Sequence, residues 1–149
     1  MTLLKSYYQL CKPNVVYMML ICAFVGMLLA EQTVSSYSYL FISLTGIALC
    51  AASAAAINQV VDREADASMT RTDQRPLPKG DLSVMHASIF AFVIGLLGAL
   101  ILYFYVNVLT MILTIGSLIG YAFIYTVYLK RATPQNIVIG GLAGAAPPL

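Results

Sequence analysis

Long stretches without a charged residue dominate this chain. Charges are absent from residues 13–30, 32–61, 82–129 and 132–149. A helix needs about 20 predominantly apolar residues to cross a hydrocarbon core of roughly 30 Å, and the third stretch is long enough to cross it twice. Because 60% of the residues are hydrophobic and the mean hydropathy is +0.86, the composition excludes an ordinary soluble domain. We therefore expect an integral membrane protein.

These runs predict an all-α fold, a polytopic transmembrane bundle of about five spans in a single domain that covers residues 1–149. In the third run, the cluster "YFYVN" (Tyr103–Asn107) has the character of a membrane interface, so we expect the chain to fold back there. Pro134 is expected in the first turn of the last span. The predicted spans are residues 14–30, 37–57, 84–104, 109–129 and 134–149.

The distribution of basic residues predicts the orientation. Short loops rich in Lys and Arg stay on the cytoplasmic side of a membrane. If the N-terminus is cytoplasmic, every Lys and Arg falls on that side, and the opposite loops hold only Glu31. Segment 58–81 then faces the cytoplasm. The net charge of +2 suits an anionic membrane surface, and the sequence shows no nucleic-acid-binding patch.

A signal peptide is the competing interpretation of the N-terminus, because Lys5 and Lys12 precede an apolar run. That run is long for a signal sequence, and several apolar runs follow it. Lys12 and Pro13 come directly before the first span, where an anchoring residue is expected. We therefore interpret the run as a membrane span and Lys12 as its anchor.

Segment 58–81, "NQVVDREADASMTRTDQRPLPKGD", holds all but one of the acidic residues and half of the basic residues. If the second span continues as a helix past Ile57, Asn58, Asp62 and Asp66 lie on one face, with successive Cα atoms about 6 Å apart. Two carboxylates and an amide suit Mg²⁺, which takes oxygen ligands and leaves positions for water and substrate phosphate. The alternative is a solvated loop whose charges only set the topology.

Basic residues follow the acidic ones in the same segment. Arg71, Arg75 and Lys79 carry the guanidinium and ammonium groups that bind phosphate oxygens. Pro76 and Pro78 stiffen the loop between them. Charged groups at the end of a span are costly to bring near lipid, and they usually line a wet functional cavity. The segment therefore predicts a site for a metal ion and a diphosphate.

Small residues recur at close spacing in the later spans. They let helix backbones approach closely in lipid, where packing replaces the hydrophobic effect as the driving force. We expect helix contacts at the run "CAASAAA" (Cys50–Ala56) and at three glycine pairs, Gly95 with Gly98, Gly116 with Gly120, and Gly140 with Gly144.

The charged segment carries a resemblance to a known family. "NQVVDREAD" resembles the N-x-x-x-D-x-x-x-D signature of the UbiA-type intramembrane prenyltransferase superfamily, and "MTRTDQRPLPKG" is similar to the R-T-x-x-R-P-L segment that follows it there. Within the superfamily, the chain is most similar to the protohaem IX farnesyltransferases, also called haem O synthases. This similarity runs through "LCKPNVV", "MTRT", "YTVYLKR" and "TPQNIVIGGLAGAAPPL", and so covers essentially the whole chain.

The resemblance implies an all-helical enzyme of the bacterial plasma (inner) membrane that transfers a farnesyl group from farnesyl diphosphate to a vinyl group of haem b, with Mg²⁺ as cofactor. Haem b is then a substrate, and the product, haem O, serves haem–copper terminal oxidases. Haem A synthase or an oxidase assembly factor is the implied partner. Asn58, Asp62 and Asp66 would hold Mg²⁺, and the diphosphate would be bound by Arg71, Arg75, Lys79 and Lys130.

Two other functions remain open. A sister enzyme that prenylates an aromatic acid of the 4-hydroxybenzoate type, in quinone synthesis, would share the acidic motif. A non-catalytic membrane scaffold, or an inactive fragment, would bind cations only incidentally. His86, at the start of the third span, is either a haem ligand or a plain polar cap.

Family members are about twice as long as this chain and carry a second aspartate-rich loop, which this sequence lacks. We therefore expect the chain to correspond to the N-terminal half of such an enzyme, with one half of the diphosphate site. Activity of this chain alone is not expected.

Overall fold

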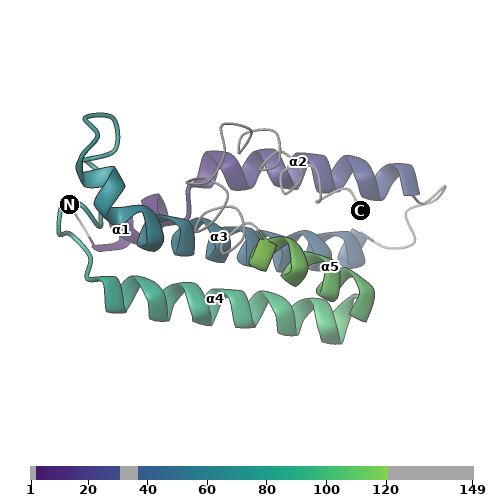
Figure 1. Cartoon of the computed structure of the whole chain (residues 1–149). Coiled ribbons are helices and arrows are strands. Elements are labelled where there is room, and N and C mark those ends of the chain that lie inside the picture. Colours follow the sequence, from purple (N-terminus) through teal and green to yellow (C-terminus); the bar gives the residue numbers. More distant parts are fainter. Residues whose placement is uncertain (1–2, 31–36, 121–149) are drawn as a thin grey trace.

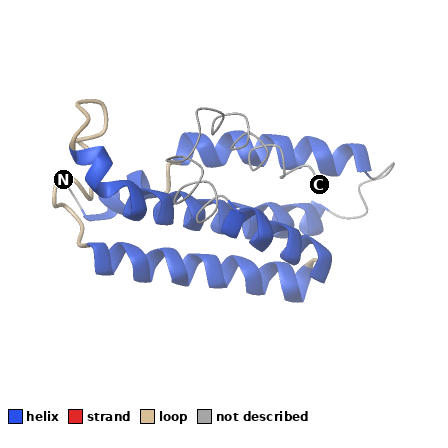
Figure 2. Cartoon of the chain, in the orientation of Figure 1, coloured by secondary structure: helices blue, strands red, loops and turns tan. Residues whose placement is uncertain are grey.

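The computed structural model describes residues 3–30 and 37–120. Every regular element in these two ranges is a helix, and neither range contains a strand (Figure 2). The predicted all-α fold is therefore confirmed for the described residues. The helices are α1 (Leu3–Leu10), α2 (Pro13–Ala30), α3 (Tyr37–Ala67), α4 (Val84–Tyr105) and α5 (Val108–Ile119).

Helix α3 is the central element of the bundle. It lies between α2 and α4, with α5 packed against α3 and α4, and α1 contacts α3 at one end of the bundle (Figure 1). Two helices, α3 and α4, are long and apolar enough to cross a membrane. A third span results if α1 and α2, which meet at an angle of 46°, are counted as one bent segment. These helices suit a membrane protein.

The number of spans and their orientation remain predictions. Helix α5 covers residues 109–119 of the predicted span 109–129, and residues 121–129 lie outside the described residues. The predicted span 134–149, with Pro134, also lies outside them. The break between α4 and α5 falls inside the interfacial cluster. There the Asn107 side chain caps α5, and its Oδ1 accepts a hydrogen bond from the Thr110 amide at 2.7 Å.

Large apolar side chains cover the outside of the bundle. Phe92 and Phe104 on α4 each expose 70% of their surface, and Leu29 on α2 exposes 81%. In water, an apolar surface of this extent would favour aggregation, whereas in lipid it is matched by the acyl chains. The exposed surface therefore agrees with the apolar sequence runs.

Helices α3 and α4 pack closely because small residues meet between them. A Cβ atom added to Gly98 would lie 2.8 Å from the Gly46 carbonyl oxygen and 2.8 Å from Cys50 Sγ. Across the same contact, Ser53 Oγ donates a hydrogen bond to the Ala91 carbonyl oxygen at 2.7 Å. The close helix approach predicted at the Cys50–Ala56 run and at the first glycine pair is therefore confirmed. Apart from the chain neighbours and the backbone of the same helix, no described residue lies within 4 Å of a Cβ added to Gly116 or Gly120, and Gly140 and Gly144 lie outside the described residues.

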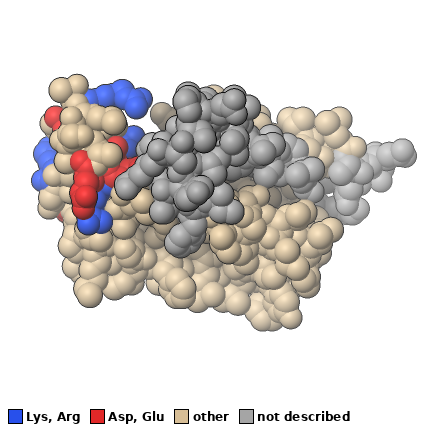
Figure 3. All heavy atoms as spheres, viewed as in Figure 1, with Lys and Arg blue, Asp and Glu red and all other residues tan. Residues whose placement is uncertain are grey.

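Charged side chains gather at one end of the bundle on the face shown in Figure 3. This is the end where α3 continues ten residues past the predicted span, from Ile57 to Ala67. It is also where the α3–α4 loop (residues 68–83) begins and ends, and where α1 meets α2. The site predicted from the sequence is therefore located at this charged end.

Candidate active site

The acidic residues lie on the extension of α3, which is the part of the helix after Ile57. Asn58, Asp62 and Asp66 are buried, with 4%, 5% and 5% of their surfaces exposed. Asn58 Nδ2 donates a hydrogen bond to Asp62 Oδ2 at 2.9 Å, as expected for side chains four residues apart on one helix face. Glu64 lies on the opposite face, where its side chain is 85% exposed and paired with Arg63. The continued helix therefore brings the three predicted metal ligands onto one protected face.

The α3–α4 loop folds back over this face. Thr72 Oγ1 donates to the Asp66 carbonyl oxygen at 3.0 Å, which ties the loop to the last turn of the helix. Farther along the loop, Leu77 and Leu82 are buried in an apolar cluster with Leu10 of α1 and Ala87 of α4. Apolar burial therefore holds a charged loop in place beside the acidic face.

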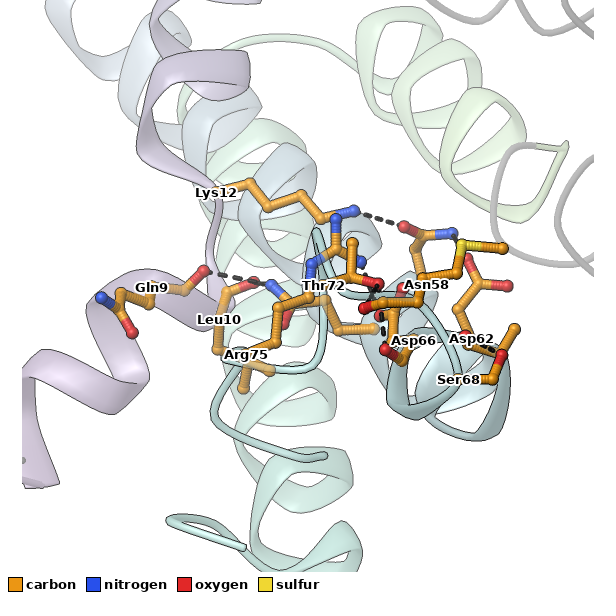
Figure 4. A network of polar contacts seen from close by, with 12 residues as sticks. Gln9, Leu10, Lys12, Asn58, Asp62, Asp66, Ser68, Thr72 and Arg75 are labelled. Atoms are coloured by element: carbon orange, nitrogen blue, oxygen red, sulfur yellow. Dashed lines mark hydrogen bonds and ion pairs between the residues drawn. The ribbon is translucent and has the colours of Figure 1, made fainter. Parts of the chain in front are cut away.

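Arg75 is the loop residue that reaches the acidic face. Its guanidinium forms an ion pair with Asp66 Oδ2 at 2.5 Å (Figure 4). The Asp66 side chain is 7% exposed and that of Arg75 is 30% exposed, so the pair is shielded on the aspartate side and open on the arginine side. A guanidinium has five N–H donors, so Arg75 can bind Asp66 and a phosphate oxygen together.

A second cation comes from a distant part of the sequence. Lys12, at the junction of α1 and α2, places its Nζ 2.5 Å from Asn58 Oδ1. Figure 4 shows Lys12 reaching this side chain from the α1–α2 junction, next to the residues of the loop. Interpreting Lys12 as a membrane anchor missed this contact. The available signal was that Lys12 and Asn58 lie at the predicted cytoplasmic ends of two spans, on the same side of the membrane.

The remaining predicted site residues have other positions. Arg71 and Lys79 are exposed on the α3–α4 loop, and neither forms an ion pair within the described residues. Lys130 lies outside the described residues. His86 is exposed in the first turn of α4, and its backbone amide donates to Ser83 Oγ, the N-cap, at 3.3 Å. Its ring Nδ1 lies 2.9 Å from the same oxygen, an arrangement that suits the polar-cap interpretation.

The residues present fit a Mg²⁺ ion that is only partly ligated by protein. No group of three His, Cys, Asp or Glu side chains among the described residues could hold a metal ion. The acidic face instead offers two carboxylates and an amide oxygen, a hard-oxygen set that leaves positions for water and phosphate, as Mg²⁺ prefers. Asn58 Oδ1 accepts a hydrogen bond from Lys12, and Asp66 Oδ2 pairs with Arg75, so each of these two oxygens faces a cation in this structure.

Comparison with known proteins identifies relatives of the chain. The profile of the UbiA prenyltransferase family matches residues 19–149. A protein named protoheme IX farnesyltransferase 2, from Pseudoalteromonas atlantica, is 58% identical over 145 residues, which are 97% of this chain and 48% of that protein. Protoheme IX farnesyltransferases from Hahella chejuensis and Idiomarina loihiensis are 55% and 56% identical over 145 residues, which are 97% of this chain and 48% and 49% of those proteins.

The chain therefore spans about half the length of the curated relatives that it matches. No solved structure shows a significant match to the chain.

Proposed function

Since the chain belongs to the UbiA prenyltransferase family, we propose that this protein transfers the farnesyl group of farnesyl diphosphate to a vinyl group of haem b, giving haem O. The names of its relatives, which are more than half identical over nearly the whole chain, support this choice of substrates. We propose that the chain corresponds to the N-terminal half of the enzyme, because its similarity covers about half of each relative.

The observation that carries this proposal is the protected acidic face of α3 with two cations beside it. Asp62 and Asp66 are buried at the end of an apolar helix, and Lys12 and Arg75 reach their face from two other segments. Buried charges are costly unless they are paired. A fold that holds these four residues together therefore favours a binding site over a loop that only sets the topology.

Asn58, Asp62 and Asp66 are the proposed Mg²⁺ ligands. A bound Mg²⁺ supplies positive charge that stabilises a departing diphosphate. The guanidinium of Arg75 is placed to bind the same diphosphate through its N–H groups while it holds Asp66. Preorganised positive charge of this kind often contributes more to catalysis than any other effect, because it needs no rearrangement when charge develops.

We propose that Arg71 and Lys79, on the loop, and Lys130, outside the described residues, complete the basic groups around the diphosphate. In the reaction, the bond between C1 of the farnesyl chain and the diphosphate oxygen breaks, and its electrons leave with the diphosphate. The vinyl group of haem b supplies the electrons for the new carbon–carbon bond, which leaves a cation on its inner carbon. Water adds to this carbon and releases a proton, which gives the hydroxyl group. Apolar helices around the site keep bulk water from quenching the farnesyl cation as farnesol.

The proposed location is the bacterial inner membrane, with segment 58–81 facing the cytoplasm, because the basic residues gather on that side. Farnesyl diphosphate is anionic and reaches the acidic and basic groups from that side, while its apolar tail lies among the helices. Transfer of haem O to a haem A synthase or to an oxidase assembly factor is proposed from the family resemblance.

The first experiment measures this reaction. Membranes that contain the complete protein encoded by the gene are incubated with haem b, farnesyl diphosphate and Mg²⁺, and the extracted haems are identified by mass spectrometry. We expect haem O, roughly a hundredfold less of it with Asp62→Ala or Asp66→Ala, and none after chelation of Mg²⁺. The control is Glu64→Ala, which removes an exposed carboxylate from the opposite face of the same helix and should leave the rate unchanged.

The outcomes distinguish the remaining functions. Prenylation of 4-hydroxybenzoate with no haem O would keep the diphosphate site and reject the haem acceptor. If Glu64→Ala lost as much activity as Asp62→Ala, the activity would depend on the total charge of the segment and not on the buried face of α3. Absence of any prenylated product would favour the non-catalytic scaffold.

A further inference from the structure

The junction between α1 and α2 is built to point Lys12 at the acidic face. Lys12 has a backbone φ of 48°, in the left-handed region that a residue with a side chain rarely adopts. Its position before Pro13 also disfavours the helical region. The chain bends by 46° here, where Pro13 cannot continue a helix from α1. Such strain persists only where surrounding contacts hold it, and it clusters at functional sites.

The contacts that hold the junction come from α3. Gln59 Nε2 donates to the carbonyl oxygens of Gln9 and Leu10, at 3.1 and 3.0 Å, and so satisfies the end of α1. Gln59 is 2% exposed and is the neighbour of Asn58 in the sequence. The same turn of α3 therefore fixes the junction through Gln59 and receives Lys12 at the preceding residue, Asn58. Figure 4 shows the contact between Lys12 and Asn58.

Lys12 and a metal ion need the same atom. Asn58 Oδ1 accepts from Lys12 Nζ, and it is also the amide oxygen that the proposed Mg²⁺ would use. A divalent cation and an ammonium on one oxygen repel each other unless an anion lies between them. A diphosphate is such an anion, and the flexible four-carbon stem of Lys allows the ammonium to move to it.

We propose that Lys12 is a further diphosphate-binding residue. Its ammonium rests on Asn58 while the site holds no substrate, and it binds a phosphate oxygen when Mg²⁺ occupies Asn58. This inference rests on the proposed function, and it assigns a substrate contact to a residue that topology alone would explain as an anchor. The proposal also explains why Lys12 has a strained backbone. A lysine that only anchors a helix at the membrane surface does not need its side chain held in one direction.

The test uses the complete protein in detergent with two probes. Electron paramagnetic resonance measures the affinity of the metal site for Mn²⁺ in the absence of an anion. Binding of radiolabelled inorganic diphosphate in excess Mg²⁺ measures the affinity for the anion. Lys12→Met keeps the length of the side chain and removes its charge, and Lys12→Arg keeps the charge. The matched control is Lys5→Met, which removes an equal charge from the exposed surface of α1.

We expect Lys12→Met to bind diphosphate about tenfold more weakly, the usual effect of losing one hydrogen bond to a charged group. Its Mn²⁺ affinity should be unchanged or a few fold higher, because a competitor for Asn58 Oδ1 is gone. Lys12→Arg should recover most of the diphosphate affinity, and Lys5→Met should match the unmodified protein.

Three results would overturn the inference. Unchanged diphosphate binding in Lys12→Met would show that the ammonium does not reach the anion, and an equal loss in Lys5→Met would show an effect of net charge. Loss of both Mn²⁺ and diphosphate affinity in Lys12→Met would indicate that Lys12 only supports the position of Asn58. A separate variant, Asp62→Asn with Lys12 unchanged, tests the metal site. If its Mn²⁺ affinity equals that of the unmodified protein, the proposed metal site is wrong, a result distinct from these three.

Discussion

At the scale of single residues, the site contains a pairing of acids and bases that the sequence spacing does not reveal. Asp66 is nearly buried, and its carboxylate is compensated by Arg75 from the α3–α4 loop. Removing one partner of a buried pair costs more than removing both, because the remaining charge stays desolvated. The Asp66–Arg75 pair therefore has a structural role as well as its proposed role in binding diphosphate, and the two roles are separable by experiment.

We predict that Arg75→Met lowers the free energy of unfolding by about 1–3 kcal/mol, because Asp66 loses its partner in a protected position. The double variant Asp66→Asn with Arg75→Met should recover much of this loss. Thermal unfolding in detergent without substrate measures both. Arg71→Met is the matched control, because Arg71 is exposed and has no ion pair within the described residues. An equal destabilisation by Arg71→Met would contradict the structural role of the pair.

At the scale of helices, periodicity explains what could be predicted and what could not. A helix that continues past Ile57 must place Asn58, Asp62 and Asp66 on one face, so this part of the site followed from a spacing of four residues. The α3–α4 loop has no such period. Spacing alone could therefore not separate Arg75, which reaches the acidic face, from Arg71 and Lys79, which are exposed.

The α1–α2 junction was missed for a related reason. The sequence shows where the helix breaks, at Pro13, but not the left-handed conformation of Lys12 or the hydrogen bonds from Gln59, which is almost fifty residues away in the sequence. No local pattern encodes a contact of this range. The small residues of α3 and α4 could be predicted to pack, because close approach of helices in lipid requires small side chains whatever the exact register.

The contact between α3 and α4 gives a prediction at this scale. We expect Gly98→Ala to lower the free energy of unfolding by about 1–3 kcal/mol, because the added Cβ meets the Gly46 carbonyl oxygen and the Cys50 backbone, which cannot rotate away. Gly95→Ala should cost less, since it meets the Ser53 side chain. Thermal unfolding in detergent compares the stabilities of the two variants.

Gly116→Ala is the control for this series. Apart from the chain neighbours and the backbone of its own helix, no described residue lies within 4 Å of the added Cβ, and alanine favours a helix over glycine by roughly 0.5–1 kcal/mol. The variant should therefore be neutral or slightly stabilising. If Gly98→Ala is as stable as Gly116→Ala, the close contact between α3 and α4 is wrong.

At the scale of the whole molecule, function depends on which membrane face carries the charged end of the bundle. The apolar surface of α2, α3 and α4 fixes the protein in lipid but does not set its direction, because lipid-facing residues are alike at both ends. Direction is instead set by the basic residues, which all lie on one predicted side. The proposed diphosphate site and the predicted topology therefore depend on the same charges.

We predict that the α3–α4 loop faces the cytoplasm and that the α4–α5 turn faces the opposite side. After Cys11, Cys22 and Cys50 are replaced by Ser or Ala, a single cysteine is introduced at Ser68 or at Tyr105, both of which are exposed. A membrane-impermeant maleimide should label Ser68→Cys only in inside-out vesicles and Tyr105→Cys only in right-side-out vesicles. The reverse pattern would invert the topology and place the acidic face where cytoplasmic farnesyl diphosphate does not reach it. Labelling of both variants from the same side would instead mean that α4 does not cross the membrane.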